Sequence, residues 1–229
     1  MTQKKQLPLR PPKSPNLLIA PVDYDQRYQD QLNNALRLYF NEIDNMGTSL
    51  TGSSGGVNIS FPFIAAGDNA VQYATASNTP TIVKWNALFD GAGFTLNTDN
   101  TATATYDGVY KITYSLQFAN DDNAAHDSIV WLRINGSTTA ADVVDSSTIF
   151  TIPARKSAGV PSYVCGYSEV VFTLNAGDKV GLWWGTDQAA SGGGATGNYI
   201  YYRTAQAAPM AYPATPSAIG SITFVSALY

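Results

Sequence analysis

The chain has 229 residues, of which 45% are apolar and only 13% are charged, about half the charged share of an ordinary soluble domain. Its formal net charge is −4, but residues 1–22 hold four basic residues and no acidic one; removing these four from the 13 basic residues leaves nine against 17 acidic ones, or −8 for the rest. This balance excludes a nucleic-acid-binding protein, because tracking phosphates requires a basic surface. No run is apolar enough to cross a membrane, so we expect neither nucleic acid nor a membrane as a partner.

Residues 1–22 are rich in proline, which fixes φ and removes backbone donors, so we predict an extended arm and no helix. The arm is either a disordered tail or a docking arm that becomes ordered on a partner; its apolar residues favour docking. It lacks the apolar run of a signal peptide, which predicts a protein made in a reducing cytoplasm. The residues that we predict to dock are basic or apolar: Lys4, Lys5, Arg10, Lys13, Leu17, Leu18 and Ile19.

Residues 23–46 predict an amphipathic helix, with Asp23 and Gln26 spaced as a capping box. Its apolar stripe follows heptad spacing from its second member onward, which leaves three arrangements open: packing on its own domain, a three-stranded neck, or packing on a neighbouring subunit. The Gly- and Ser-rich residues 47–56 predict a flexible hinge. The residues of this helix seam are Tyr28, Leu32, Leu36, Tyr39 and Ile43.

Residues 57–229 predict an all-β domain of about ten short strands. The clearest strand, residues 106–118, alternates strictly between apolar or aromatic side chains and smaller polar ones, which is the period of a half-buried strand. Turn signals recur every 10 to 20 residues with no helical pattern between them, which indicates an antiparallel sandwich or barrel. The predicted strands are 57–66, 70–77, 81–90, 106–118, 127–136, 147–154, 162–174, 179–186, 198–203 and 217–229.

Three motifs of this domain resemble the tumour necrosis factor and complement globular-head superfamily. Gly108-Val109-Tyr110 opens a strand as the family's Gly-x-Tyr does, "LNAGDKVGLWW" (174–184) resembles its Leu-x-x-Gly-Asp-x-Val-x-Leu element, and "FVSALY" (224–229) is similar to its closing strand. The chain departs from the pattern at Ala102, where the family has an aromatic residue. The resemblance implies a jelly roll that forms a homotrimer around an apolar axis, for which the candidates are Tyr110, Tyr114, Trp183, Tyr201 and Tyr229.

The first 50 residues have a second resemblance. The basic Pro-rich arm followed by "APVDYDQRYQDQLNNALRLYFNEIDN" is similar to the N-termini of virion structural proteins of phages that infect marine cyanobacteria. In those proteins varied β-rich domains follow. This resemblance implies that the arm attaches the protein to a virion, with capsid or tail proteins as partners and assembly in the host cytoplasm.

Few residues could support catalysis or metal binding. His126 is the only histidine and lies in a polar loop, and Cys165 lies in a strand, where a small buried thiol is expected, so we predict no catalytic dyad and no enzyme. Asp121, Asp122 and Asp127 are a weak candidate for calcium, which requires several convergent oxygens, although a solvated loop is the favoured interpretation. We expect no cofactor.

The Gly-rich segment 185–198 has neither the helix nor the Lys-Ser/Thr of a phosphate loop. We interpret it as an exposed loop at one end of the sandwich, where recognition residues commonly lie. Our candidates for contact with a host glycan or protein are Asp187, Gly193 and Asn198.

Together these observations predict a non-enzymatic phage virion protein, in which three copies form a jelly-roll knob that residues 1–46 fasten to the capsid or tail. In one version the knob presents loops for attachment to the host surface. In the other it is a stabilising capsid decoration or tail connector without a receptor. A third hypothesis, a soluble tumour necrosis factor-like ligand, is disfavoured by the missing signal peptide.

Overall fold

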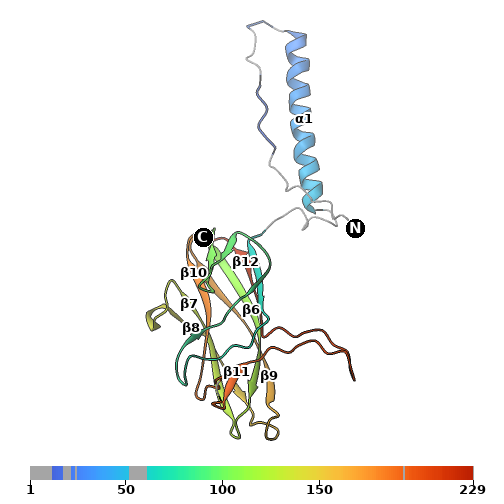
Figure 1. Ribbon diagram of the computed structural model, residues 1–229. Coiled ribbons are helices and arrows are strands. Elements are labelled where there is room, and N and C mark those ends of the chain that lie inside the picture. The colour runs from blue at the N-terminus through green and yellow to red at the C-terminus, as the bar shows by residue number, and fades with distance from the viewer. Residues whose placement is uncertain (1–11, 18–21, 24, 52–60, 193, 229) are drawn as a thin grey trace. The chain divides into compact units, whose positions relative to one another are not determined.

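The computed structural model describes residues 12–17, 22–23, 25–51, 61–192 and 194–228, which belong to two compact units, Met1–Ser60 and Phe61–Tyr229. The first unit contains helix α1 (Gln26–Thr51), shown in blue in Figure 1. Its seam residues, Tyr28 to Ile43, are half-buried, whereas Leu38 and Phe40 on another side of the helix are more than half exposed.

Helix α1 differs from the prediction at both ends. The predicted capping box at Asp23 is wrong, because the carboxylate of Asp25 accepts a 2.8 Å hydrogen bond from the backbone N–H of Arg27 and so caps the helix. The helix also continues to Thr51, so residues 47–51 are helix and not hinge. Gly47 costs only about 1 kcal/mol relative to alanine within a helix, and no proline follows to stop the helix. The rest of the predicted hinge, 52–56, lies outside the described residues.

The second unit is a sandwich of two antiparallel sheets with jelly-roll strand order (Figure 1). The first sheet, here called sheet A, has the strand order β9, β6, β12, β1, β3. The short strand β11 also pairs with β6, on the same edge as β12. The strands of sheet A are β1 (Phe63–Asp68), β3 (Ala87–Ala92), β6 (Gly108–Asn120), β9 (Ser162–Leu174), β11 (Asn198–Ile200) and β12 (Ala218–Ser226).

The second sheet, here called sheet B, has the strand order β8, β7, β10, β5, β4. The short strand β2 also pairs with β10, on the same edge as β5. Because β1 pairs with β12, and β10 pairs with β2, β5 and β7, strands from distant parts of the chain meet in each sheet. The strands of sheet B are β2 (Thr81–Ile82), β4 (Phe94–Leu96), β5 (Ala102–Ala104), β7 (His126–Ile134), β8 (Asp142–Ile152) and β10 (Lys179–Thr186).

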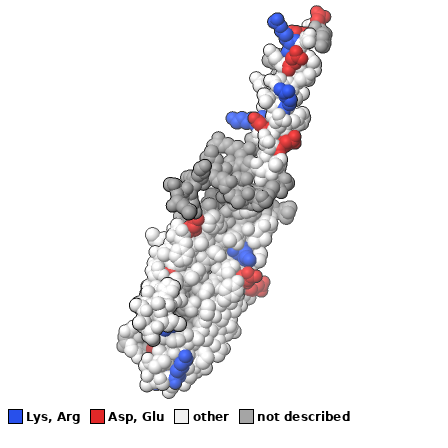
Figure 2. All heavy atoms as spheres, turned by 90° about the vertical axis from the view of Figure 1, so that its right-hand side faces the viewer, with Lys and Arg blue, Asp and Glu red and all other residues white. Residues whose placement is uncertain are grey.

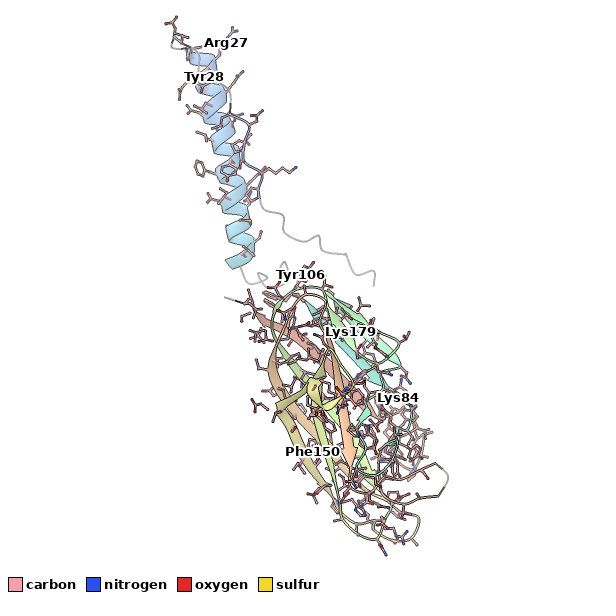
Figure 3. The ribbon with its side chains drawn as sticks, turned by 90° about the vertical axis from the view of Figure 1, so that its left-hand side faces the viewer. Arg27, Tyr28, Lys84, Tyr106, Phe150 and Lys179 are labelled. Atoms are coloured by element: carbon pink, nitrogen blue, oxygen red, sulfur yellow. The ribbon has the colours of Figure 1, made fainter. Side chains whose placement is uncertain are left out.

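The core lies between the two sheets and follows the period-two pattern of the long strands. In β6 the even-numbered side chains from Tyr110 to Phe118 are almost completely buried, while the odd-numbered ones before Ala119 are half-buried on the outer face. Phe118 packs on Phe150 of β8, labelled in Figure 3, with 5.7 Å between their ring centroids. Burial of each large apolar side chain contributes about 1.5–3 kcal/mol to folding.

The strand predictions differ from the structure in the short elements. Residues 70–77 form no strand and make only a single bridge, between Gln72 and Ile200. The three-residue strands β4 and β5 were not predicted, because so short a segment shows no periodicity. The predicted strand 81–90 is also divided, into β2 of sheet B and β3 of sheet A, so the described residues contain twelve strands where about ten were predicted.

The chain enters the sandwich at one end, and three loops lie at the opposite end. The chain enters the domain near Phe63, which pairs with Thr223 at the C-terminal end of β12. Strand β6 begins at this end with Gly108 and reaches the opposite end at Asn120. The loops after β6, β8 and β10 therefore gather at the end of the sandwich that lies away from the chain's entry.

Candidate functional site

His126 joins two of the loops at this end. Its Nε2 lies 2.8 Å from a carboxylate oxygen of Asp122 in the β6–β7 loop, and its Nδ1 lies 3.4 Å from Asp187 after β10. Burial by itself lowers the pKa of His126, but the hydrogen bonds and charges of Asp122 and Asp187 outweigh it and raise this pKa above the usual value. His126 therefore fixes the loops to each other, most strongly when it is protonated.

The predicted calcium ligands are held by protein donors. Asp121 accepts a hydrogen bond from the backbone N–H of Gly197 (2.7 Å), Asp122 faces His126, and Asp127 accepts one from the hydroxyl of Thr151 (2.6 Å). The described residues contain no group of three or more His, Cys, Asp or Glu side chains that could bind one metal ion. The three aspartates do not converge on a cation, and each stabilises a loop instead.

The three predicted ligand-contact residues have different positions. Asp187 is half-exposed and accepts a hydrogen bond from the backbone N–H of Asp127 (3.1 Å). The prediction for Asn198 is wrong, because its side chain is fully buried and donates to the hydroxyls of Ser128 and Thr186, both at 3.1 Å. Gly193 lies outside the described residues.

Two of the predicted trimer-axis residues lie inside the domain. Tyr110 and Tyr114 are no more than 1% exposed, because the alternation of β6 directs both towards sheet B, so they cannot contact another subunit. Tyr201 is half-buried, with its ring centroid 5.1 Å from that of Tyr163 on β9. Tyr229 lies outside the described residues.

The outer face of sheet A was not predicted as a site, yet it exposes large apolar side chains on neighbouring strands. Tyr167 of β9 and Ile219 of β12 flank Ser115 of β6 in one row across the sheet. On the outward-facing positions of β6, β9 and β12 only Lys111 and Glu169 are charged, and they lie 3.4 Å apart as a pair. Figure 2 shows how few charged side chains interrupt one side of this domain. The exposed apolar residues of this face are Tyr163, Tyr167, Val171, Ile219 and Val225.

Cys165 also lies on this outer face and is exposed, so the prediction of a buried thiol is wrong. The reason lies in its neighbour: Gly166 faces the core, where a Cβ atom would approach Phe118 to 2.7 Å. Alternation then directs Cys165 and Tyr167 outward. Cys165 contacts Ser115 and Gln117, and in the described structure both ring nitrogens of His126 face carboxylates, so neither is paired with the thiol.

A second exposed element projects from the sandwich between β11 and β12, and appears as the long dark-red loop in Figure 1. Backbone hydrogen bonds join Arg203 to Thr215 and Gln206 to Tyr212, so the two sides of the loop support each other. The guanidinium of Arg203 also lies 4.6 Å from the ring centroid of Tyr212. Its tip, residues 207–211, is uncharged and exposed.

The outer face of sheet B is organised around a buried cation. Arg133 is only 3% exposed, and its guanidinium lies 4.3 Å from the ring centroid of Trp183 and 5.5 Å from that of Trp131. One oxygen of Asp142 accepts hydrogen bonds from Nε of Arg133 (2.5 Å) and from Nε1 of Trp131 (2.7 Å). The bond from Arg133 and then that from Trp131 lower the pKa of Asp142. Trp183 therefore belongs to this cluster on sheet B, and Trp131, which the sequence analysis did not select, is held in one orientation.

In the first unit, two of the predicted docking residues can be located. Lys13 and Leu17 are both exposed, as a docking role requires, while Lys4, Lys5, Arg10, Leu18 and Ile19 lie outside the described residues. No helix in the described part of the chain is long and apolar enough to span a membrane.

Comparison with known proteins shows similarity of fold alone. No protein-family model matches the sequence, and no curated protein matches it. Among the solved structures with a similar fold is the Eiger tumour necrosis factor of S. frugiperda, with 12% sequence identity and a TM-score of 0.45, covering 73% of this chain and 96% of that one. None of these comparisons supports the resemblance of residues 1–50 to phage virion proteins, which stays a prediction. The two antiparallel sheets of the jelly-roll sandwich rest on the strand pairing of this chain itself.

Proposed function

We propose that the chain is a non-enzymatic structural protein of a phage virion, in which three copies associate as a knob and present one end to the host surface. The observation that carries this proposal is the outer face of strands β6, β9 and β12 in sheet A, whose exposed apolar side chains are accompanied by a single charged pair. Contiguous apolar surface of this kind is typical of a protein–protein interface. Association through this face explains why so few residues of the chain are charged.

The projecting loop supports self-association. Its tip carries alanines, a proline and Met210, which is 68% exposed. The backbone bridges between its two sides reduce the conformational entropy that it would lose on binding. Because the tip is uncharged and the loop is stabilised by its backbone bridges, the tip can contact the apolar face of another copy.

The polarity of the knob supports an attachment role. The chain enters the sandwich at the end where Phe63 pairs with Thr223, and the loops fixed by His126 lie at the opposite end. A protein fastened through its N-terminal segment would therefore present these loops outward. The exposed Lys13 and Leu17 and the half-buried seam of α1 are the described parts available for docking to the particle.

Particle composition tests this proposal. Mass spectrometry of density-purified phage particles should detect the full chain, and a chain without residues 1–46 should be absent from otherwise normal particles. Particles that never contain the full chain, or that incorporate the shortened chain equally well, would contradict the virion role.

A further inference from the structure

The outer face of sheet B contains a groove of about 340 Å³, which is within the usual size range of small-ligand sites. One wall is the segment before β2, including Thr79 and Pro80, and the other is formed by Ile129 and Trp131 of β7. We infer that this groove binds a neutral saccharide unit. The inference rests on the proposed attachment function, for which it names a site and a ligand class.

The floor of the groove is open because residue 185 is glycine. A Cβ atom placed there would lie 3.7 Å from the carbonyl oxygen of Thr79 and 3.7 Å from Cη2 of Trp131. Both walls therefore come within van der Waals distance of a single methyl group at this point. A side chain larger than alanine at position 185 would occupy the space between them.

Both walls are fixed before any ligand arrives. The backbone N–H of Asn78 donates a 2.7 Å hydrogen bond to the carbonyl of Thr186, which ties the segment before β2 to the edge of β10. On the other side, the indole N–H of Trp131 is held by Asp142, so the opposite edge of the indole, the six-membered ring, faces Gly185. A preformed site avoids the entropic cost of ordering side chains on binding.

The charged groups of the groove are hydrogen-bond acceptors. Asp127 and Asp187 both line it. The hydroxyl of Thr151 orients the carboxylate of Asp127, and the backbone N–H of Asp127 and Nδ1 of His126 orient that of Asp187. A carboxylate has about four acceptor positions, so each retains capacity for further donors. None of the residues that line the groove is basic, which disfavours an anionic ligand.

A sugar ring matches this arrangement. Its C–H face can pack against the six-membered ring of Trp131 and against Ile129 or Pro80, while its hydroxyl groups donate to Asp127 and Asp187. A purely apolar ligand would use none of the remaining acceptor positions of the carboxylates and would displace water from them, and a sialylated or sulfated sugar would be repelled by them. The groove is therefore suited to neutral hexose or N-acetylhexosamine units.

The test applies the full-length protein to an array of neutral oligosaccharides built from glucose, galactose, mannose and N-acetylglucosamine, with sialylated and sulfated oligosaccharides and poly-lysine as comparators. Calorimetric titration then measures the affinity for the neutral oligosaccharide that binds best. We expect binding to neutral members only.

Three variants locate the site. Trp131→Ala and Gly185→Val should each weaken binding at least tenfold, and Asp127→Asn several-fold. Gly185→Val is the more informative, because a Cβ there makes only ordinary contacts and the Arg133 cluster stays intact. Tyr106→Ala is the matched aromatic control: Tyr106 is 56% exposed just before β6 (Figure 3) and should leave binding unchanged.

Several outcomes would overturn the inference. These are no binding to any neutral oligosaccharide, preference for anionic sugars or poly-lysine, and neutral binding that Gly185→Val and Trp131→Ala leave unaltered. None of them touches the virion role, which is tested by particle composition, and a chain absent from particles could still bind sugars in this groove. Sugar binding therefore tests the groove alone, and particle composition tests the virion role alone.

Discussion

The outer faces of sheets A and B are both formed by strands with alternating side chains, but the large side chains on the two faces are held differently. On sheet A, Tyr167 and Ile219 stand exposed, and the one charged pair on β6, β9 and β12 joins Lys111 to Glu169. On sheet B, Trp131 and Trp183 are held by Arg133 and Asp142, and a groove lies beside them. A broad face of loosely held apolar side chains suits association with another copy, whereas rigid aromatic rings beside a recess suit a small ligand.

The largest expected effect comes from placing a charge on the face of sheet A. Ile219→Asp should convert the proposed trimer to a monomer, because an association interface would have to bury the new carboxylate without a partner. Ile149→Asp introduces the same charge at a residue that is even more exposed, on β8 of sheet B, and should leave the mass unchanged. Light scattering compares the two variants. Equal masses for both would show that sheet A is not the interface.

The next effect concerns the fixed aromatic residues of sheet B. Asp142→Ala removes the carboxylate that pairs with the buried Arg133 and accepts from Trp131, and should cost about 2–4 kcal/mol of unfolding free energy. Asp145→Ala on the same strand, at an exposed position, should cost less than about 0.5 kcal/mol. Urea unfolding at one protein concentration measures both, since the stability of an oligomer depends on concentration. Similar losses would mean that Asp142 does not stabilise the cluster.

Much of this contrast lies beyond sequence patterns. Alternation in residues 106–118 correctly predicted a strand with two faces, and the aromatic face proved to be the core. The same aromatic residues were assigned to a trimer axis, because a sequence does not show whether an apolar face meets another sheet or another subunit. Trp131 was overlooked because its pairing with Trp183 depends on the register between β7 and β10, which are separated by more than 40 residues.

The loops joined by His126 should respond to pH. The pKa of His126 is raised in the folded protein, so its contribution to stability is complete below the unfolded value of 6.5 and is lost as pH rises through the folded value. The melting temperature of the wild type, relative to that of His126→Gln, should therefore fall as the pH rises above about 6.5. The effect should be about 1 kcal/mol or less, as for partly exposed ion pairs. Parallel pH profiles for the two proteins would contradict this account of the loops.

The smallest effect concerns the start of α1. Asp25→Ala removes the carboxylate that accepts from Arg27 and should destabilise the helix by about 1 kcal/mol. Asp23→Ala, at the position that the sequence pattern favoured, should have almost no effect. Circular dichroism at 222 nm during thermal unfolding distinguishes the two. A larger loss for Asp23→Ala would restore the capping box that the structure replaces.

The central claim is that the β-domain associates by itself through sheet A, which leaves the N-terminal segment available for docking. The most direct test is the solution mass of the full chain and of a shortened chain that begins at Val57, measured by light scattering. We predict three copies in both cases. A monomeric shortened chain beside a trimeric full chain would contradict the claim and assign self-association to helix α1.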